Sequence, residues 1–165
     1  MNEDEKKQIG QRLTTRVSTG LSFIEFNYLN NHATPDAAWI RNIYILLSFY
    51  TELLLKAVFI VKKEFTDVND LDNQLRKIGH NFVAAGKEIG ESELLEFGIK
   101  AIRFVNHEYL IETNDGEFYV KDFNDIRYDF LDGRVRTLQG NEHEEFKKQI
   151  EIMLAINSKL KPLVW

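Results

Sequence analysis

Apolar residues recur every three or four positions near both ends of this chain, which is the spacing of amphipathic helices. The series near the start consists of Ile9, Leu13, Val17, Leu21, Ile24 and Tyr28. It predicts a helix of about seven turns, which Gly10 and Gly20 weaken slightly. The series near the end consists of Phe146, Ile150, Met153, Leu154, Asn157 and Leu160. It predicts a final helix that Asn141 caps and Pro162 ends.

A second helix is predicted from Pro35 to about Lys63, because Thr34 is a good N-cap and proline suits the first helical position. Apolar residues cover most of this helix surface, so we expect it to be central and buried. Glu52 and Lys56 lie on its polar stripe, one turn apart. They form either an ordinary solvated pair or part of a polar site within a helical core.

The middle of the chain predicts shorter elements. Helical spacing indicates a helix over residues 67–78, a short piece closed by Gly90, and a helix from Ser92 to about Asn106. The period then changes, and Asn114-Asp115-Gly116 between two alternating runs predicts a β-hairpin near residues 108–122. Residues 122–140 are irregular. The pattern therefore predicts one all-α domain over residues 1–165, a helical bundle with a small β-hairpin insertion.

Composition narrows the function classes. The chain has 21 basic and 26 acidic residues and a net charge of −5, so it has no global basic field for nucleic acid. It has no cysteine, which excludes thiol chemistry and fits a cytoplasmic location. The polar N-terminus resembles no signal peptide, and the apolar stretches appear in short, interrupted runs. We therefore expect no membrane association.

Familiar catalytic motifs do not occur. The sequence has no P-loop, no Gly-x-Gly-x-x-Gly, no His-Glu-x-x-His and no EF-hand loop. The histidines His32, His80, His107 and His143 are scattered and lack histidine partners one turn away. We therefore predict neither a metal site nor a cofactor.

Three short motifs follow one another in a fixed order. Glu52-Leu53-Leu54-Leu55-Lys56-Ala57 lies on the long second helix, Gly79-His80-Asn81-Phe82 follows, and Ile126-Arg127-Tyr128 precedes the final helix. This order resembles the HEPN family, the higher eukaryote and prokaryote nucleotide-binding domains. The resemblance implies an up-and-down bundle of about five helices, a homodimer, and a nucleotide or RNA as ligand.

On this resemblance Lys56, His80 and Arg127 match the basic or polar positions of the family, and Glu52 lies beside the lysine. Together they suit a phosphate, and Tyr128 is available for base stacking or a hydrogen bond. The alternative is a structural network, in which Glu52 with Asp125 or Asp129 neutralises the cations.

Many HEPN proteins are ribonucleases with an arginine and a histidine separated by four to six residues. Arg76 and His80, like Arg103 and His107, enclose only three, whereas Arg136 and His143 enclose six. In metal-independent RNA cleavage the histidine would transfer a proton and the arginine would stabilise the phosphorane-like charge.

Two functions therefore stay open. The first is a non-catalytic module that binds a nucleotide or a partner protein, and the second is an endoribonuclease of toxin–antitoxin or defence type. A purely structural interaction domain is a third, less specific interpretation. A neighbouring gene for a small nucleotidyltransferase would identify a partner protein and favour a toxin–antitoxin role.

Overall fold

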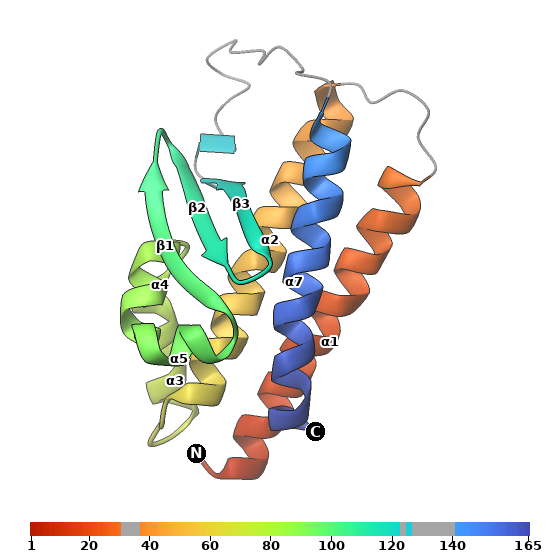
Figure 1. The fold of residues 1–165 in the computed structure, drawn as a ribbon. Helices are drawn as coiled ribbons and strands as arrows, with labels where there is room; N and C mark the ends of the chain where they lie inside the picture. The colour runs from red at the N-terminus through yellow and green to blue at the C-terminus, as the bar shows by residue number, and fades with distance from the viewer. Residues whose placement is uncertain (31–36, 123–124, 127–140) are drawn as a thin grey trace.

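Three long helices form the body of the protein, and a small sheet with short helices packs beside them (Figure 1). The computed structural model describes residues 1–30, 37–122, 125–126 and 141–165. In these residues the long helices are α1 (Glu3–Ile24), α2 (Ala37–Lys62) and α7 (Glu142–Val164), and the short ones are α3 (Val68–Ile78), α4 (Phe82–Ile89) and α5 (Glu91–Glu96). A π-helical turn, η1 (Glu25–Leu29), extends α1. The predicted mostly helical fold is confirmed.

The second helix, α2, is central as predicted, because it packs against α1, α4, α7 and the sheet. Residues such as Ile43, Leu54 and Val58 are almost completely buried. By length and composition the segment Trp39–Lys62, with a mean hydropathy of 1.8, could cross a membrane, so its apolar stretch is longer than we expected. Within its most apolar window 61% of the residues are buried inside the fold, as in the central helix of a bundle.

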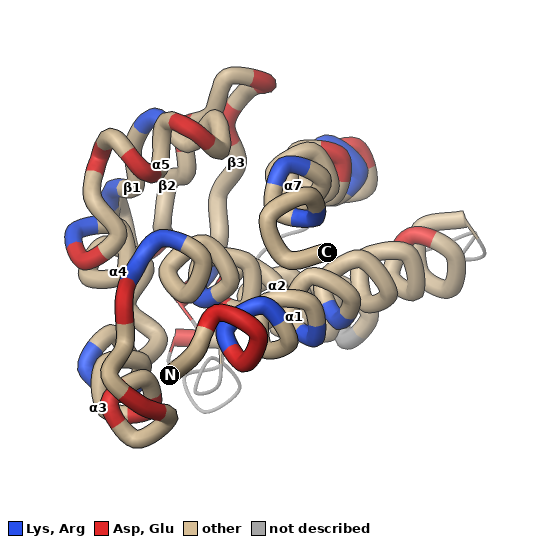
Figure 2. The backbone as a smooth tube through the Cα atoms, turned by 90° about the horizontal axis from the view of Figure 1, so that it is seen from below, with Lys and Arg blue, Asp and Glu red and all other residues tan. Residues whose placement is uncertain are grey.

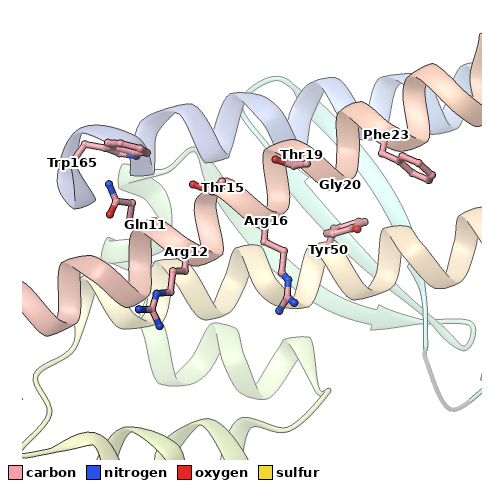
Figure 3. A pocket seen from close by; sticks show the side chains of 9 residues that line it. All are labelled: Gln11, Arg12, Thr15, Arg16, Thr19, Gly20, Phe23, Tyr50 and Trp165. Atoms are coloured by element: carbon pink, nitrogen blue, oxygen red, sulfur yellow. The ribbon is translucent and has the colours of Figure 1, made fainter.

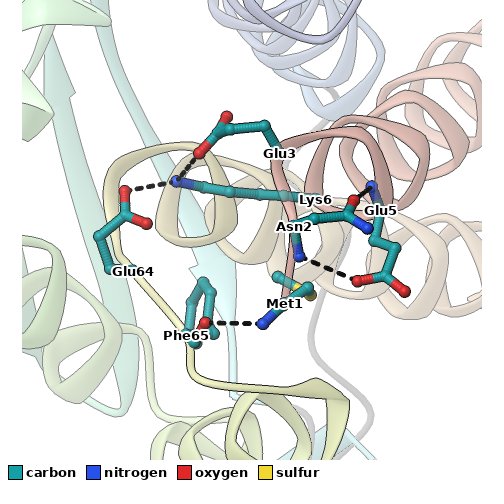
Figure 4. A network of polar contacts seen from close by, with 7 residues as sticks. All are labelled: Met1, Asn2, Glu3, Glu5, Lys6, Glu64 and Phe65. Atoms are coloured by element: carbon teal, nitrogen blue, oxygen red, sulfur yellow. Dashed lines mark hydrogen bonds and ion pairs between the residues drawn. The ribbon is translucent and has the colours of Figure 1, made fainter.

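The start of α1 is fixed to the loop that follows α2 (Figure 4). Asn2 and Glu5 form a reciprocal capping box that satisfies two backbone N–H groups at the helix start. The buried Lys6 ammonium donates to the Glu64 carboxylate at 2.9 Å, and the Met1 amine donates to the Phe65 carbonyl at 3.1 Å. Farther along α1, the carbonyl of Thr14 accepts from the amide of Asn157 on α7.

The sheet contains β1 (Ile99–Val105), β2 (Glu108–Thr113) and β3 (Gly116–Lys121), antiparallel in the order β1-β2-β3. The predicted hairpin is β2 and β3, but it is one part of a three-stranded sheet. Viewed from below, the sheet and α3 to α5 lie on one side of the long helices (Figure 2). The inner face of the sheet packs into the core through Ile111, Phe118 and Val120.

The predicted helix from Ser92 to Asn106 is wrong, because helix α5 ends at Glu96 and β1 follows. Gly98 has a φ of +83°, a left-handed conformation that breaks the helix. Asn106 and His107 also have positive φ angles, 51° and 67°, and form the two-residue turn that joins β1 to β2. Both central residues of such a hairpin turn need a positive φ.

Two predictions about the last helix are also wrong in detail. Asn141 stands at the N-cap position of α7, but its amide donates to the Glu145 side chain instead of capping the backbone. Pro162 lies inside the helix, which continues to Val164. Proline has no backbone N–H, so Pro162 removes one hydrogen bond from the last turn of the helix without ending it there.

Candidate functional site

The carboxylate of Glu52 on α2 joins two cationic or titratable side chains. Oε1 lies 2.5 Å from the Lys56 ammonium, and Oε2 lies 2.6 Å from Nδ1 of His80. The exposed fraction is 13% for the Glu52 side chain, 22% for Lys56 and 56% for His80. This geometry differs from an ordinary solvated pair, because Glu52 is largely buried and a residue from another element contacts it.

The turn between α3 and α4 holds His80 in place. Helix α3 ends at Ile78, and the Gly79 that caps it has a φ of +57°, a left-handed value that suits glycine. Asn81 caps α4, and its side chain accepts from the backbone N–H of Ala84 at 3.0 Å. His80 therefore stands between the ends of two helices. A buried carboxylate needs charged or hydrogen-bonding partners, and Lys56 and His80 supply them for Glu52.

Beside this cluster lies a small pocket of about 10 Å³, enough for roughly one water molecule. Leu55, Ile78 and Phe82 line it together with Glu52 and Lys56, and its surface is almost entirely apolar. A nucleotide cannot fit inside a space of this size. A nucleotide would therefore have to contact Glu52, Lys56 and His80 from outside this pocket.

Three of the predicted site residues, Arg127, Tyr128 and Arg136, lie outside the described residues, as does Asp129. The sequence predicted five residues in one ligand site. In the described part of the chain, Glu52, Lys56 and His80 lie together.

The candidate catalytic residues of the sheet, Arg103 and His107, each lie near a carboxylate instead of pairing with one another. Arg103 on β1 forms an ion pair with Glu112 on β2. His107, in the β1–β2 turn, has Nδ1 4.0 Å from a carboxylate oxygen of Asp125. Within the described residues no hydrogen bond or ion pair joins Arg103 to His107.

His143 lies half-buried in the first turn of α7, and Arg136, its predicted companion, lies outside the described residues. An assembled arginine–histidine pair is therefore not among the described contacts. Cleavage of RNA stays a prediction of the resemblance.

One residue near the cluster was missed by the sequence analysis. Tyr109 on β2 is only 5% exposed, and its ring lies 4.6 Å from that of Phe82, measured between centroids. Burial raises the pKa of its hydroxyl, Asp122 and Asp125 raise the pKa further, and a hydrogen bond with the Phe82 backbone lowers it. The alternation of the strand predicts that Tyr109 is buried, but no local pattern predicts its contact with α4.

The described residues contain no group of three histidine, aspartate or glutamate side chains arranged to hold a metal ion. The Glu52 cluster has one carboxylate, one imidazole and one ammonium. An ammonium donates hydrogen bonds and cannot ligate a cation, so this chemistry suits an anion or a hydrogen-bonding ligand.

No protein-family model matches this chain, and comparisons with curated proteins and with solved structures found no match. The resemblance to HEPN domains therefore stays a prediction that rests on the order of the short motifs.

Proposed function

We propose that this protein is a non-catalytic, HEPN-like helical module that binds the phosphate of a nucleotide at the surface cluster of Glu52, Lys56 and His80. One observation carries the proposal. Motifs 28 residues apart in the sequence supply side chains that meet at the Glu52 carboxylate. The resemblance implies that these residues share one site, and the contact between Glu52 and His80 supports that expectation.

The chemistry of the cluster suits an anion of modest charge. Lys56 supplies an ammonium, and His80 supplies a half-exposed imidazole ring. The formal charges of Glu52 and Lys56 cancel, so the protein tolerates the cluster without a ligand.

The finer parts of the resemblance belong to the same proposal. Arg127 would add a bidentate phosphate donor and Tyr128 a stacking surface for a base. An up-and-down arrangement of about five helices, a homodimer and a nucleotidyltransferase partner would follow from membership of the family. RNA belongs to the same ligand class, because one phosphate of its backbone would bind as the phosphate of a nucleotide does.

The test is a thermal-shift panel of nucleoside mono-, di- and triphosphates. Wild-type protein should gain several degrees with at least one nucleotide, and Lys56→Ala, His80→Ala and Arg127→Ala should lose the gain. Lys62→Ala is the matched control, because Lys62 lies on the same helix and pairs with Glu96 outside the cluster. No shift with any nucleotide, or an equal loss in the control, would overturn the proposal.

The endoribonuclease is tested separately, with structured and single-stranded RNA and no added metal. Cleavage that disappears in His107→Ala or His143→Ala would replace the non-catalytic proposal. Cleavage unchanged in both variants would indicate a contaminant or another site.

A further inference from the structure

The exposed side of α1 forms one wall of a shallow groove with a volume of about 700 Å³ (Figure 3). Tyr50 of α2 and the C-terminal Trp165 complete it. Two of its aromatic side chains are well exposed, with exposed fractions of 53% for Phe23 and 73% for Trp165. Phe23 lies at one end of the groove and Trp165 at the other, so a ligand that follows α1 along its length would cover both rings (Figure 3).

Two arginines lie along the same groove, one helical turn apart. Arg12 and Arg16 are both exposed, and Figure 3 shows their side chains extending to the same side of α1. In the part of the chain that the structure describes, no carboxylate forms an ion pair with either of them. Like charges one turn apart destabilise a helix slightly, so an acidic ligand at this position would relieve a local repulsion.

We propose that this groove binds an acidic amphipathic helix of a partner protein. From Gln11 to Phe23 the groove follows α1 for about 18 Å, the length of a helix of three to four turns. Carboxylates one turn apart on the partner helix would match Arg12 and Arg16, and its apolar residues would cover Phe23 and Trp165. A helix laid in a groove buries both kinds of group at once.

The charge of the protein favours a peptide over a nucleic acid. Binding of a nucleic-acid strand draws much of its affinity from many cationic contacts to successive phosphates, on the order of 6–10 for a protein on duplex DNA. This groove offers two arginines, and the basic positions of the chain are spread among acidic ones over most elements (Figure 2). Two arginines beside aromatic rings are instead sufficient for a peptide with two carboxylates.

The same charges disfavour a second copy of this chain. A two-fold interface places the same patch on both subunits, which would bring Arg12 and Arg16 close to their own copies. The groove is also distinct from the proposed nucleotide site. Tyr50 and Glu52 are two residues apart on α2 and so point to nearly opposite sides of that helix.

The test is a selection from a displayed library of helical peptides with randomised surface positions and no charge bias. Enriched peptides should carry two acidic residues one turn apart beside an apolar stripe. In fluorescence anisotropy, Arg12→Glu with Arg16→Glu should weaken their binding at least tenfold, and Trp165→Ala should weaken it several-fold. The matched control is Lys77→Glu with Lys87→Glu, the same charge change at exposed positions of α3 and α4.

Each other outcome overturns the proposal. Enriched peptides without acidic residues, or equal weakening in the control, would exclude recognition by the two arginines. An oligouridylate that displaces the best peptide at lower concentration would reassign the groove to nucleic acid. Concentration-dependent dimerisation that the double arginine variant abolishes would reassign it to a second copy. Circular dichroism shows whether each variant keeps its helical content.

Discussion

The ring of Tyr50 on α2 lies so close to Gly20 on α1 that a Cβ at position 20 would stand 2.0 Å from Tyr50 Cζ. Side-chain atoms of real structures do not approach to this distance. Glycine in a helix interior costs about 1 kcal/mol relative to alanine. The close approach explains why α1 carries a residue that weakens it, since the glycine lets the Tyr50 ring rest on the helix backbone.

Gly20→Ala should therefore have opposite effects in two backgrounds. In the wild-type protein the new methyl group displaces the Tyr50 ring, and we expect a loss of about 1–3 kcal/mol in the free energy of unfolding. In a Tyr50→Ala background the methyl group meets no ring, and the better helix propensity should stabilise the protein by up to about 1 kcal/mol. Urea denaturation of the four proteins measures both. A stabilisation of similar size in both backgrounds would show that the Tyr50 contact is unimportant.

The long helices were predictable because the spacing of their apolar residues matches the faces that they bury in the folded protein. The pattern around Ile43 and Val58 indicates a helix apolar on most sides, and α2 is buried on most sides. The spacing of Ile99, Ile102 and Val105 fits a helix equally well, yet these residues form β1. The decisive signals were a left-handed Gly98 and an Asn106-His107 turn, which is far less recognisable than Asn-Gly.

The site was predictable in part, for a different reason. Spacing on α2 places Glu52 next to Lys56, but nothing local brings His80 to the same carboxylate. Only the resemblance in motif order suggested that contact. The groove had no sequence signature, because Trp165 reaches α1 only through the packing of α7 against it.

The buried Glu52–Lys56 pair should be more strongly coupled than an exposed pair of the same spacing. Asp72 and Arg76 are the matched control, also an acid followed by a base at i,i+4, with exposed fractions of 55% and 77%. Double-mutant cycles with alanine should give about 0.3–0.5 kcal/mol for the exposed pair and more than about 1 kcal/mol for the buried pair. Equal coupling energies would show that Glu52 and Lys56 behave as an ordinary solvated pair.

His107→Gly should stabilise the β1–β2 turn. The φ of 67° at His107 is left-handed, which costs a non-glycine residue roughly 1 kcal/mol. Glycine removes this strain but adds freedom to the unfolded chain, so we expect a net gain of about 0.5 kcal/mol in thermal or urea unfolding. Gly116→Ala is the opposite control, because its φ of 132° suits only glycine. A loss of stability in His107→Gly would show that contacts of the ring, such as that with Asp125, outweigh the strain.

Tyr109 should make the protein sensitive to alkaline pH. Its pKa in the folded protein is raised above the ordinary value of 10.0, chiefly by burial and then by Asp122. Above pH 10 the unfolded chain therefore loses the phenolic proton while the folded protein still keeps it, so the free energy of unfolding falls as the pH rises. Below pH 10 both states hold the proton, and the contribution of Tyr109 to stability is fully present.

The substitution Tyr109→Phe isolates this effect. At pH 8 the variant should be less stable than wild type by about 0.5–1.5 kcal/mol, because it loses the hydrogen bond with the Phe82 backbone. As the pH rises through 10 to 11, wild type should lose stability faster than the variant, and the difference between them should shrink or reverse. The measurement is urea unfolding of both proteins at pH 8 and at pH 11. The other tyrosines ionise in both proteins, so their contribution cancels in the difference between the two. A difference that stays constant would mean that water reaches the Tyr109 hydroxyl in the folded protein, and that the contact between β2 and α4 beside His80 is looser than its 4.6 Å ring separation indicates.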